Sequence, residues 1–458
     1  MDRPNGILAA TAATVMAIAL VAQLLIATGR MPGIMINELE AGAKFVLDPG
    51  AHLLSMVALA LGVLVAIYSG RYLGLDHHYE EYYPLLLLLL AAVLVMLAAV
   101  DLFVLYLGAT LASAASFVLV ALRRRSATAV EAGYKYAILG ALGSELMLFG
   151  VALVFRSTGE LRMPFSPRPT DLWGVMGTQF ILVGLLVKSA IFPAHTWLPD
   201  AYSRAPSSIS AILSGIVGPS YLYSLVRVGL GVYVSPYWLG VTLVVLAVFT
   251  MTVGNTLALR QRYGKKLLGY SSVANVGYMS AAFGVGLITQ RPEPIAAGLF
   301  LLVAHAAAKS LAFLCKGVFR FYYDATLVDD LDGLIYRAPL AAGGFVLALA
   351  GLAGIPLLGG FIAKIGLLTS VYESMPIGLW VVAFLLLNIL ISLGYYIPLI
   401  GHVLNTSPEP ARPFRVSAWM LAPMVWLGVL VLLPGLIPEP LLEWTMAAAT
   451  GMLSWGVP

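Results

Sequence analysis

Long apolar stretches alternate with short polar connections along almost the whole chain. A membrane-crossing helix needs about 20 mainly apolar residues, and no polar connection exceeds about 25 residues, too few for a separate folded domain. The pattern therefore predicts an all-α polytopic membrane protein. Thirteen stretches have spanning length, at residues 7–29, 51–69, 84–100, 102–123, 133–155, 174–198, 208–232, 237–259, 267–289, 294–318, 339–370, 376–403 and 415–435.

Two places in this pattern need separate treatment. Spans 84–100 and 102–123 are divided only by Asp101, which predicts a tight helical hairpin. The tail at 439–455 is apolar but begins Pro-Glu-Pro and carries Glu443 and Trp444. We therefore expect the tail to be an interfacial helix rather than a fourteenth span.

Composition supports the membrane assignment and excludes several kinds of function. The chain has 458 residues, of which 60% are hydrophobic and 10% charged, whereas soluble domains carry about 25% charged residues. The single cysteine, Cys315, argues against disulfides and against cysteine-based metal or iron–sulfur sites. No nucleotide-binding fingerprint follows a strand. We therefore expect no cofactor, no metal and no redox site in this chain.

The net charge of +4 reports membrane topology rather than nucleic-acid binding, because basic residues accumulate in cytoplasmic connections. Fourteen Lys and Arg residues lie on the side of the N-terminus: Arg3, Arg71, Arg123, Arg124, Arg125, Arg204, Arg260, Arg262, Lys265, Lys266, Arg320, Arg337, Arg412 and Arg415. Seven lie on the opposite side: Arg30, Lys44, Arg156, Arg162, Arg168, Arg227 and Arg291. We therefore predict a cytoplasmic N-terminus and, with thirteen spans, an external C-terminus.

A weak internal symmetry is visible in the sixth and eleventh spans. Lys188 is followed by Pro193, and Lys364 follows the Gly- and Pro-containing stretch from Gly354 to Phe361. Paired interrupted spans are typical of inverted repeats in transporters. We predict N-terminal spans at 1–83, five-span repeats at 84–232 and 237–403, and a C-terminal span and tail at 404–458.

Few ionisable groups fall well inside the apolar spans: Glu145, Lys188, His305, Lys309, Lys316 and Lys364. A charge at membrane depth costs roughly 3 kcal/mol even on lenient scales, so each is a candidate functional residue. Structural roles compete with this interpretation. Lys316 lies near a span end and could extend its ammonium into the interface, and Glu145 or His305 could simply hold helices together.

The interior cations outnumber the one interior carboxylate, and their arrangement suggests proton transfer. His305 and Lys309 are four residues apart, so they share one helix face. Buried Lys, Glu and His side chains can all gain and lose protons near neutral pH. A row of such groups bridged by water would form a proton relay.

Four stretches carry a specific family resemblance: DLFVLYLGATLASAASFVLVAL, KSAIFPAHTWLPDAYSRAPSSISAILSG, KKLLGYSSVANVGYM, and HAAAKSLAFL followed by AGIPLLGGFIAK. On these stretches the chain resembles the antiporter-like membrane subunits shared by bacterial respiratory complex I, membrane-bound (group 4) hydrogenases and Mrp-type cation/proton antiporters. The resemblance covers about 400 residues. It implies fourteen or more spans, two inverted five-span repeats with broken helices, and a central polar axis that moves protons. By this resemblance the chain lacks one N-terminal span.

The resemblance assigns roles residue by residue. Lys188 matches the family's broken-helix lysine, and Lys364 matches the terminal lysine or glutamate near the outer exit. His305 and Lys309 match the His and Lys of the second repeat. His195 and Asp200 match polar positions of the WLPDA stretch. The resemblance therefore places these six residues on the proton pathway.

Two departures from the family pattern affect the first repeat. Thr110 stands where the family has the glutamate that pairs with the broken-helix lysine, and Pro219 stands where it usually has a lysine. Glu145, in the neighbouring span, is the available replacement. We therefore predict that Glu145 partners Lys188; otherwise the first half-channel is inactive.

The leading functional hypothesis is a proton-translocating subunit, with Na⁺ as the alternative ion, of a redox-driven complex of the complex I or membrane-bound hydrogenase type. Its partners would be other antiporter-like and quinone-site-type membrane subunits and, through them, a peripheral redox arm; no nucleic acid is expected. Two alternatives stay open: a subunit of a non-redox Mrp-type antiporter, and a scaffold subunit that has lost pumping. We expect it in a bacterial or archaeal plasma membrane.

Overall fold

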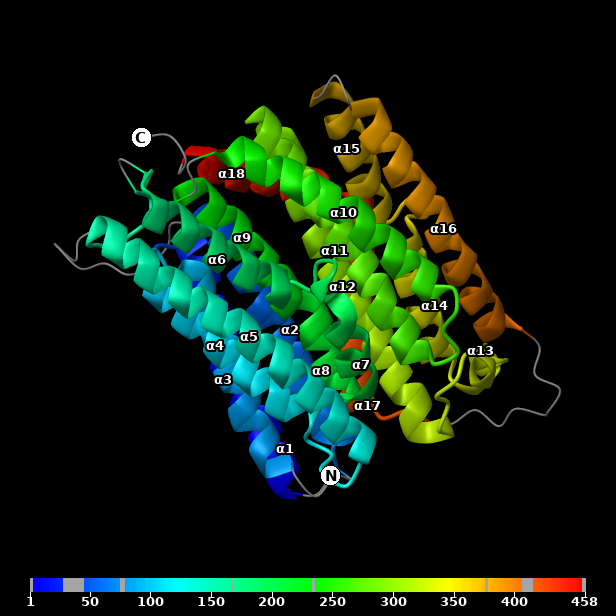
Figure 1. The fold of residues 1–458 in the computed structure, drawn as a ribbon. Coiled ribbons are helices and arrows are strands. Elements are labelled where there is room, and N and C mark those ends of the chain that lie inside the picture. Colours follow the sequence, from blue (N-terminus) through cyan, green and yellow to red (C-terminus); the bar gives the residue numbers. More distant parts are fainter. Residues whose placement is uncertain are drawn as a thin grey trace.

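The computed structural model describes residues 3–27, 45–74, 79–165, 168–232, 235–374, 378–405 and 415–454. Arg30, Lys44 and Arg412, which entered the orientation prediction, lie outside these residues. The described part is helical, with three isolated β-bridges and no sheet, which confirms the all-α class (Figure 1). The helices are α1(Arg3–Ala27), α2(Pro49–Tyr72), α3(Tyr79–Ala98), α4(Leu102–Val120), α5(Ala127–Thr158), α6(Leu172–Lys188), η1(Ala194–Thr196), α7(Trp197–Arg204), α8(Ser207–Ile212), η2(Leu213–Val217), α9(Gly218–Gly231), α10(Pro236–Ala258), α11(Gly264–Thr289), α12(Pro292–Tyr323), η3(Asp329–Leu331), α13(Leu334–Arg337), α14(Pro339–Ala353), α15(Gly359–Ser374), α16(Gly378–Leu404), α17(Ala418–Leu436) and α18(Glu439–Ser454).

Eleven helices among the described residues are long and apolar enough to cross a membrane, and two shorter apolar helices, α6 and α14, accompany them. The multi-pass membrane character predicted from the sequence is thereby confirmed. Both short helices belong to the spans predicted to be interrupted. The count of thirteen spans, the inverted repeats and the proposed domain boundaries stay predictions.

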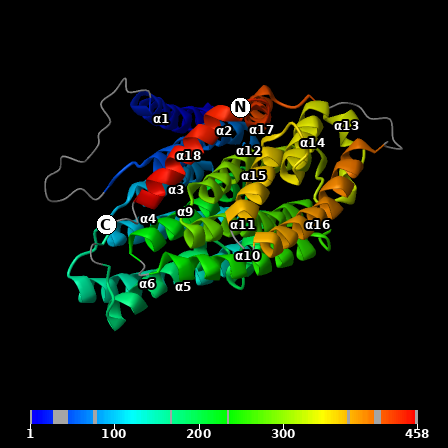
Figure 2. The same ribbon diagram turned by 90° about the horizontal axis from the view of Figure 1, so that it is seen from above.

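The core of the bundle lies around α12, which packs against α2, α8, α11, α14, α15, α17 and α18. In its most apolar stretch α12 is 94% buried, whereas α1 is 22% buried. Seen from above, α12 lies between the edge that carries α1 and α18 and the edge that carries α5, α10 and α16 (Figure 2). Polar groups on α12 are therefore the most shielded from the lipid.

Both predicted helix interruptions are present. The sixth span ends as a helix at Lys188, passes through Ala190 with a left-handed φ of 56°, and resumes as η1 and α7. The eleventh span ends at Ala353, turns through Gly354 and Leu357, with φ of 84° and 74°, and resumes as α15. Left-handed backbone is costly for Ala and Leu and gathers at functional sites. Each break thus combines local strain with a nearby lysine.

The structure also describes the hairpin predicted at Asp101 and the apolar tail near the C-terminus. Asp101 caps α4 by accepting hydrogen bonds from the amides of Phe103 and Val104, and α3 packs directly on α4, so the tight hairpin is confirmed. Helix α18 packs against α2 and α12 and runs across the end of the bundle in Figure 1. Its interfacial location stays a prediction, because the structure contains no membrane.

Candidate ion pathway

Lys188 is buried at the last residue of α6 and points into a polar cluster of neutral groups. Its Nζ donates to Ser113 Oγ at 2.7 Å, to Ser144 Oγ at 2.8 Å and to the Gly140 carbonyl at 3.1 Å. The ammonium also lies 5.6 Å from the centre of the Tyr221 ring. These contacts use all three ammonium donors without any carboxylate.

Glycines bring Lys188 close enough to α5 for this arrangement. A Cβ on Gly143 would lie 3.0 Å from the Gly184 carbonyl oxygen, and one on Gly150 would lie 2.5 Å from the Gly177 carbonyl oxygen. Small residues at such contacts let two backbones approach closely. The α5–α6 contact is therefore tight enough for the Lys188 side chain to reach the carbonyl of Gly140.

Thr110, at the position where a family carboxylate was expected, belongs to the same hydrogen-bond network. Its Oγ1 donates to Ser144 Oγ at 3.2 Å, one step from the Lys188 ammonium. On the other side, Ser113 Oγ and Tyr221 Oη are 2.9 Å apart. Pro219 lies buried at the start of α9 and has no side-chain donor or acceptor. The cluster is thus built from hydroxyls.

The predicted pairing of Glu145 with Lys188 is wrong. Glu145 follows Ser144 in sequence, but its side chain is exposed on the outer face of α5. It makes no hydrogen bond or ion pair with any residue that the structure describes. Because α5 is apolar on most of its surface, the face on which Glu145 falls was not evident from the sequence. Lys188 uses the serine next to Glu145 instead.

A second cluster surrounds Lys309 on the central helix α12. Lys309 is fully buried, and its Nζ donates to the Leu268 carbonyl at 2.7 Å and to Ser271 Oγ. Ser272, beside Ser271 on α11, hydrogen-bonds Ser214 in the π-helix η2 at 2.9 Å. Lys309 thus sits beside the polar contact that joins α11 to η2.

Lys364 and His305 meet at one small cavity. Lys364 Nζ donates to the carbonyls of Leu352 and Ala353 at 2.8 and 3.0 Å, so it neutralises the unpaired carbonyl end of α14. The cavity has a volume of about 10 Å³ and is lined by His305 and Lys364, together with Asn275. It is close to the minimum that holds one water. His305 Nδ1 is buried and has no hydrogen-bond partner among the described residues.

An amide and tyrosine network lies beside this cluster and was not predicted. Asn255 Nδ2 donates to Tyr278 Oη at 3.1 Å and to Asn388 Oδ1 at 3.1 Å, and its Oδ1 accepts from Tyr395. Tyr278 lies under the Lys364 ammonium at 5.7 Å. The only available sequence signal was the presence of Asn255 and Asn388 within otherwise apolar spans.

His195 and Asp200 occupy the segment after the first break, and only His195 is buried. His195 stacks on Phe192, and its Nδ1 has no partner within the described chain. Asp200 pairs with Lys266 at 2.8 Å and with Lys135 at 3.5 Å. Burial raises the pKa of Asp200, but the charges and hydrogen bonds of Lys266 and Lys135 outweigh it and hold the pKa below its usual value. Among the described residues, neither His195 nor Asp200 forms a hydrogen bond with Lys188 or Lys309.

Lys316 lies near the end of α12 and is buried within the chain, and its expected position at the membrane interface stays a prediction. It is 1% exposed and donates to the carbonyls of Ala325 and Leu327 at 3.0 and 3.4 Å. Within the described chain, no cluster of three or more His, Cys, Asp or Glu side chains could hold a metal ion. The candidate site is therefore a set of buried lysines and a histidine held by hydroxyls and carbonyls.

Comparison with known proteins identifies the class of this helical membrane chain. Residues 99–391 match the family described as NADH:quinone oxidoreductase/Mrp antiporter, TM. The chain belongs to this family. F(420)H(2) dehydrogenase subunit N of Methanosarcina mazei is 31% identical over 88% of this chain and 84% of its own. NADH-quinone oxidoreductase subunit N of Nitrosomonas europaea is 32% identical over 77% of this chain and 74% of its own.

Solved structures share the fold over nearly the whole chain. A chain of the membrane-bound sulfane sulfur reductase, an archaeal respiratory membrane complex, is 26% identical with a TM-score of 0.85 and coverage of 99% and 96%. A chain of respiratory complex I from Thermus thermophilus is 27% identical with a TM-score of 0.78 and coverage of 95% and 93%. A chain of the Mrp complex from Dietzia is 23% identical with a TM-score of 0.86 and coverage of 99% and 97%, which shows the fold alone.

Proposed function

We propose that this protein is a proton-translocating, antiporter-like subunit of a redox-driven multi-subunit membrane complex. One observation carries the proposal: Lys188, His305, Lys309 and Lys364 are all buried in the helix bundle, and none of them forms an ion pair among the described residues. Retaining an unpaired lysine at membrane depth is costly, so a structural role alone is a weak explanation for three of them. Groups that exchange protons account for the pattern.

The arrangement gives the second repeat the more complete path. Ser271 joins Lys309 to α11, His305 lies one helical turn from Lys309, and the small cavity joins His305 to Lys364. Lys364 in turn lies at the break between α14 and α15, where the carbonyls of Leu352 and Ala353 accept hydrogen bonds from its ammonium. We propose Lys309, His305 and Lys364 as successive members of one pathway, with His195, Asp200 and Lys188 on the approach from the first repeat.

Function within a larger assembly has its own support. Glu145 presents a carboxylate on the exposed face of a spanning helix, where lipid contact would be costly. A neighbouring membrane subunit would cover it. The relatives are named as subunits of F(420)H(2) dehydrogenase and NADH-quinone oxidoreductase. We therefore propose antiporter-like or quinone-site-type membrane subunits as partners, with a redox arm beyond them.

A scaffold role is the second candidate, and the first repeat favours it. Thr110 and Pro219 leave Lys188 with hydroxyl and carbonyl partners only, so that repeat lacks a carboxylate or imidazole beside its lysine. A subunit with two such repeats would not pump. This chain differs from such a scaffold subunit because its second repeat contains Lys309, His305 and Lys364.

The test is to isolate the tagged chain with its natural partners and reconstitute the assembly into proteoliposomes. The proposal expects co-purified subunits with iron–sulfur or nickel–iron motifs and proton uptake driven by electron transfer. The chain alone, given an imposed pH gradient, should show no coupled cation/proton exchange. Exchange by the isolated chain, or an assembly without redox subunits, would favour the Mrp-type antiporter. Redox activity with no dependence on the buried lysines would favour the scaffold.

We also propose a bacterial or archaeal plasma membrane with a cytoplasmic N-terminus, from the distribution of Lys and Arg. Single cysteines placed at Arg125 and Arg156, on opposite predicted sides, test this orientation after Cys315 is replaced by serine. A membrane-impermeant thiol reagent added to intact cells should label the Arg156 position only.

A further inference from the structure

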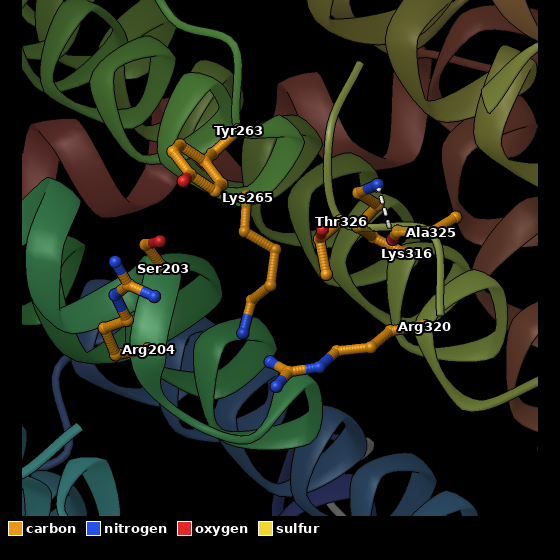
Figure 3. Close-up of a pocket in the computed structure, with 8 residues that line it drawn as sticks. All are labelled: Ser203, Arg204, Tyr263, Lys265, Lys316, Arg320, Ala325 and Thr326. Carbon is orange, nitrogen blue, oxygen red and sulfur yellow. Dashed lines mark hydrogen bonds between the residues drawn. The ribbon is translucent and has the colours of Figure 1, made fainter. Parts of the chain in front are cut away.

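A pocket at one end of the bundle collects four cations from three helices. Arg204 ends α7, Lys265 begins α11, and Lys316 and Arg320 lie in the last turns of α12. Tyr263 and Thr326 complete the polar part of its wall. Figure 3 shows the Lys265 ammonium and the Arg320 guanidinium pointing toward one another. We call this the basic pocket.

The charges in the basic pocket are not balanced by the chain itself. Lys265 and Lys316 are 6% and 1% exposed, and the charges of Arg320, Lys316 and Arg204 all act on Lys265. Among the described residues, none of the four forms an ion pair with a carboxylate. Asp330 acts on Lys316, but its Oδ2 already accepts from the amides of Thr326 and Leu327 at 2.8 and 2.7 Å.

Free hydrogen-bond donors also face the basic pocket. Lys265 donates to the Ala205 carbonyl, and Lys316 donates to two loop carbonyls. Each ammonium has three donors and each guanidinium five. The Arg204 guanidinium lies over the Tyr263 ring at 5.8 Å, and neither Arg204 nor Arg320 makes a side-chain hydrogen bond within the described residues. Donors therefore outnumber the acceptors that the chain supplies.

The size and charge of the pocket select the ligand. Its volume is about 180 Å³, far above the ~10 to 15 Å³ of the same kind of space that one water needs, so a polyatomic anion fits. Guanidinium groups match the geometry of phosphate oxygens in two-point contacts. Four cations with spare donors suit a phosphate group better than one carboxylate, because it offers more oxygens and carries a single negative charge as a lipid phosphodiester or about 1.5 to 2 as a monoester or free phosphate.

We propose that the basic pocket binds a phosphate group. The group could belong to a phospholipid, since the pocket lies at the ends of spanning helices, or to free phosphate from the aqueous phase. In either case its oxygens would accept hydrogen bonds from Arg204, Lys265, Arg320 and Lys316. The ligand relieves the repulsion among these side chains and fixes the ends of α7, α11 and α12 to one another.

The experiment uses the full-length chain purified with its co-purifying subunits. Inorganic phosphate is titrated against chloride at equal ionic strength, and thermal unfolding is followed. Retention of phosphatidylglycerol against phosphatidylcholine is followed by native mass spectrometry. The main variant is Arg204→Gln with Arg320→Gln, because neither side chain makes a hydrogen bond within the described residues and their replacement leaves the backbone contacts of the fold in place. Arg260→Gln, an exposed cation on the same side and outside the pocket, is the matched control.

Binding of the phosphate-bearing probe should weaken about tenfold or more for each arginine removed, given about 1.5 to 3 kcal/mol per charged hydrogen bond. Arg320→Gln alone should show an intermediate loss if the double variant is poorly produced, and Arg260→Gln should bind normally. Stabilisation by inorganic phosphate supports a site open to free phosphate. Selective retention of phosphatidylglycerol without an effect of inorganic phosphate supports a lipid headgroup.

Three results would overturn the proposal. The first is that neither probe binds the wild type more tightly than the double variant. The second is that Arg260→Gln loses binding as strongly. The third is a structure of the assembly in which an acidic side chain of a partner subunit fills the pocket.

Discussion

The polar cluster around Lys188 and the one around Lys309 and Lys364 hold their lysines in similar ways but differ in what lies next to them. In both, serine hydroxyls and backbone carbonyls accept from a buried ammonium, and no carboxylate takes part. Beside Lys188 there are only hydroxyls and the Gly140 carbonyl. Beside Lys309 and Lys364 there are a second titratable group, His305, and a cavity close to the size of one water.

The difference shows that burying a lysine and building a pathway are separate requirements. Three neutral acceptors satisfy the Lys188 ammonium, which explains how the chain tolerates the charge. They do not provide a group that receives its proton. In the second region the proposed pathway runs through Lys309 and His305 on α12 to Lys364 on α15, which would give a proton successive sites. The two halves therefore predict unequal effects when their lysines are replaced.

The largest effect is expected for Lys364→Met, which keeps the side-chain length and removes the charge. Proton uptake attributable to this subunit should be lost, because the path from His305 has no further acceptor. The measurement is protons moved per electron by the reconstituted assembly. Subunit composition and redox turnover should stay near normal, since an apolar residue of similar shape can replace a buried charge without loss of stability. Unchanged coupling would make Lys364 merely structural.

Lys188→Met should reduce proton uptake less than Lys364→Met does, because its cluster holds no carboxylate or imidazole to exchange a proton with the lysine. Glu145→Gln should leave uptake unchanged, since Glu145 faces away from Lys188. Both variants are compared in the same proteoliposome assay. If Lys188→Met and Lys364→Met were equally damaging, the contrast between the regions would fail.

Thr110→Glu should make the first region more like the pattern of the family. The new carboxylate would stand beside Ser144 and within reach of Lys188, since Thr110 Oγ1 is 3.2 Å from Ser144 Oγ. We expect Lys188→Met to reduce proton uptake by a larger amount in the Thr110→Glu background than in the wild type. The readout is this difference between backgrounds, with Thr110→Gln as the uncharged control. Equal costs in both backgrounds would show that the missing carboxylate is not what limits the first region.

The smallest effect is expected for Asp200→Asn, at the junction of α7 with α5 and α11. Because the pKa of Asp200 is lowered in the folded chain, its contribution to stability is present above the ordinary carboxyl pKa of ~3.9 and is lost as the pH falls through the lowered value. Its partners are partly exposed, so we expect a loss of about 0.5 to 1 kcal/mol at neutral pH. Thermal unfolding at pH 7 and in acid checks this; the two proteins should converge in acid.

The helix breaks were predictable because a lysine next to Pro or Gly is rare in an apolar span and has a direct physical meaning. The side of α5 on which Glu145 lies could not be predicted, because a helix that is apolar on nearly all sides shows no hydrophobic periodicity that marks its buried face. Asn255 and Asn388 were missed for a related reason: each is a lone amide, and their contact joins α10 to α16 across 133 positions of sequence. Contacts between spans that are far apart in the sequence can be recognised only once the fold is known.

The most direct test of the account is a double-variant cycle between His305 and Lys364 in the reconstituted assembly, with protons per electron as the readout. The residues line the same cavity, and residues that act as one unit give non-additive losses. His305→Gln should reduce uptake, Lys364→Met should reduce it further, and the double variant should be no worse than Lys364→Met alone. Independent, additive losses would contradict a shared pathway through the cavity.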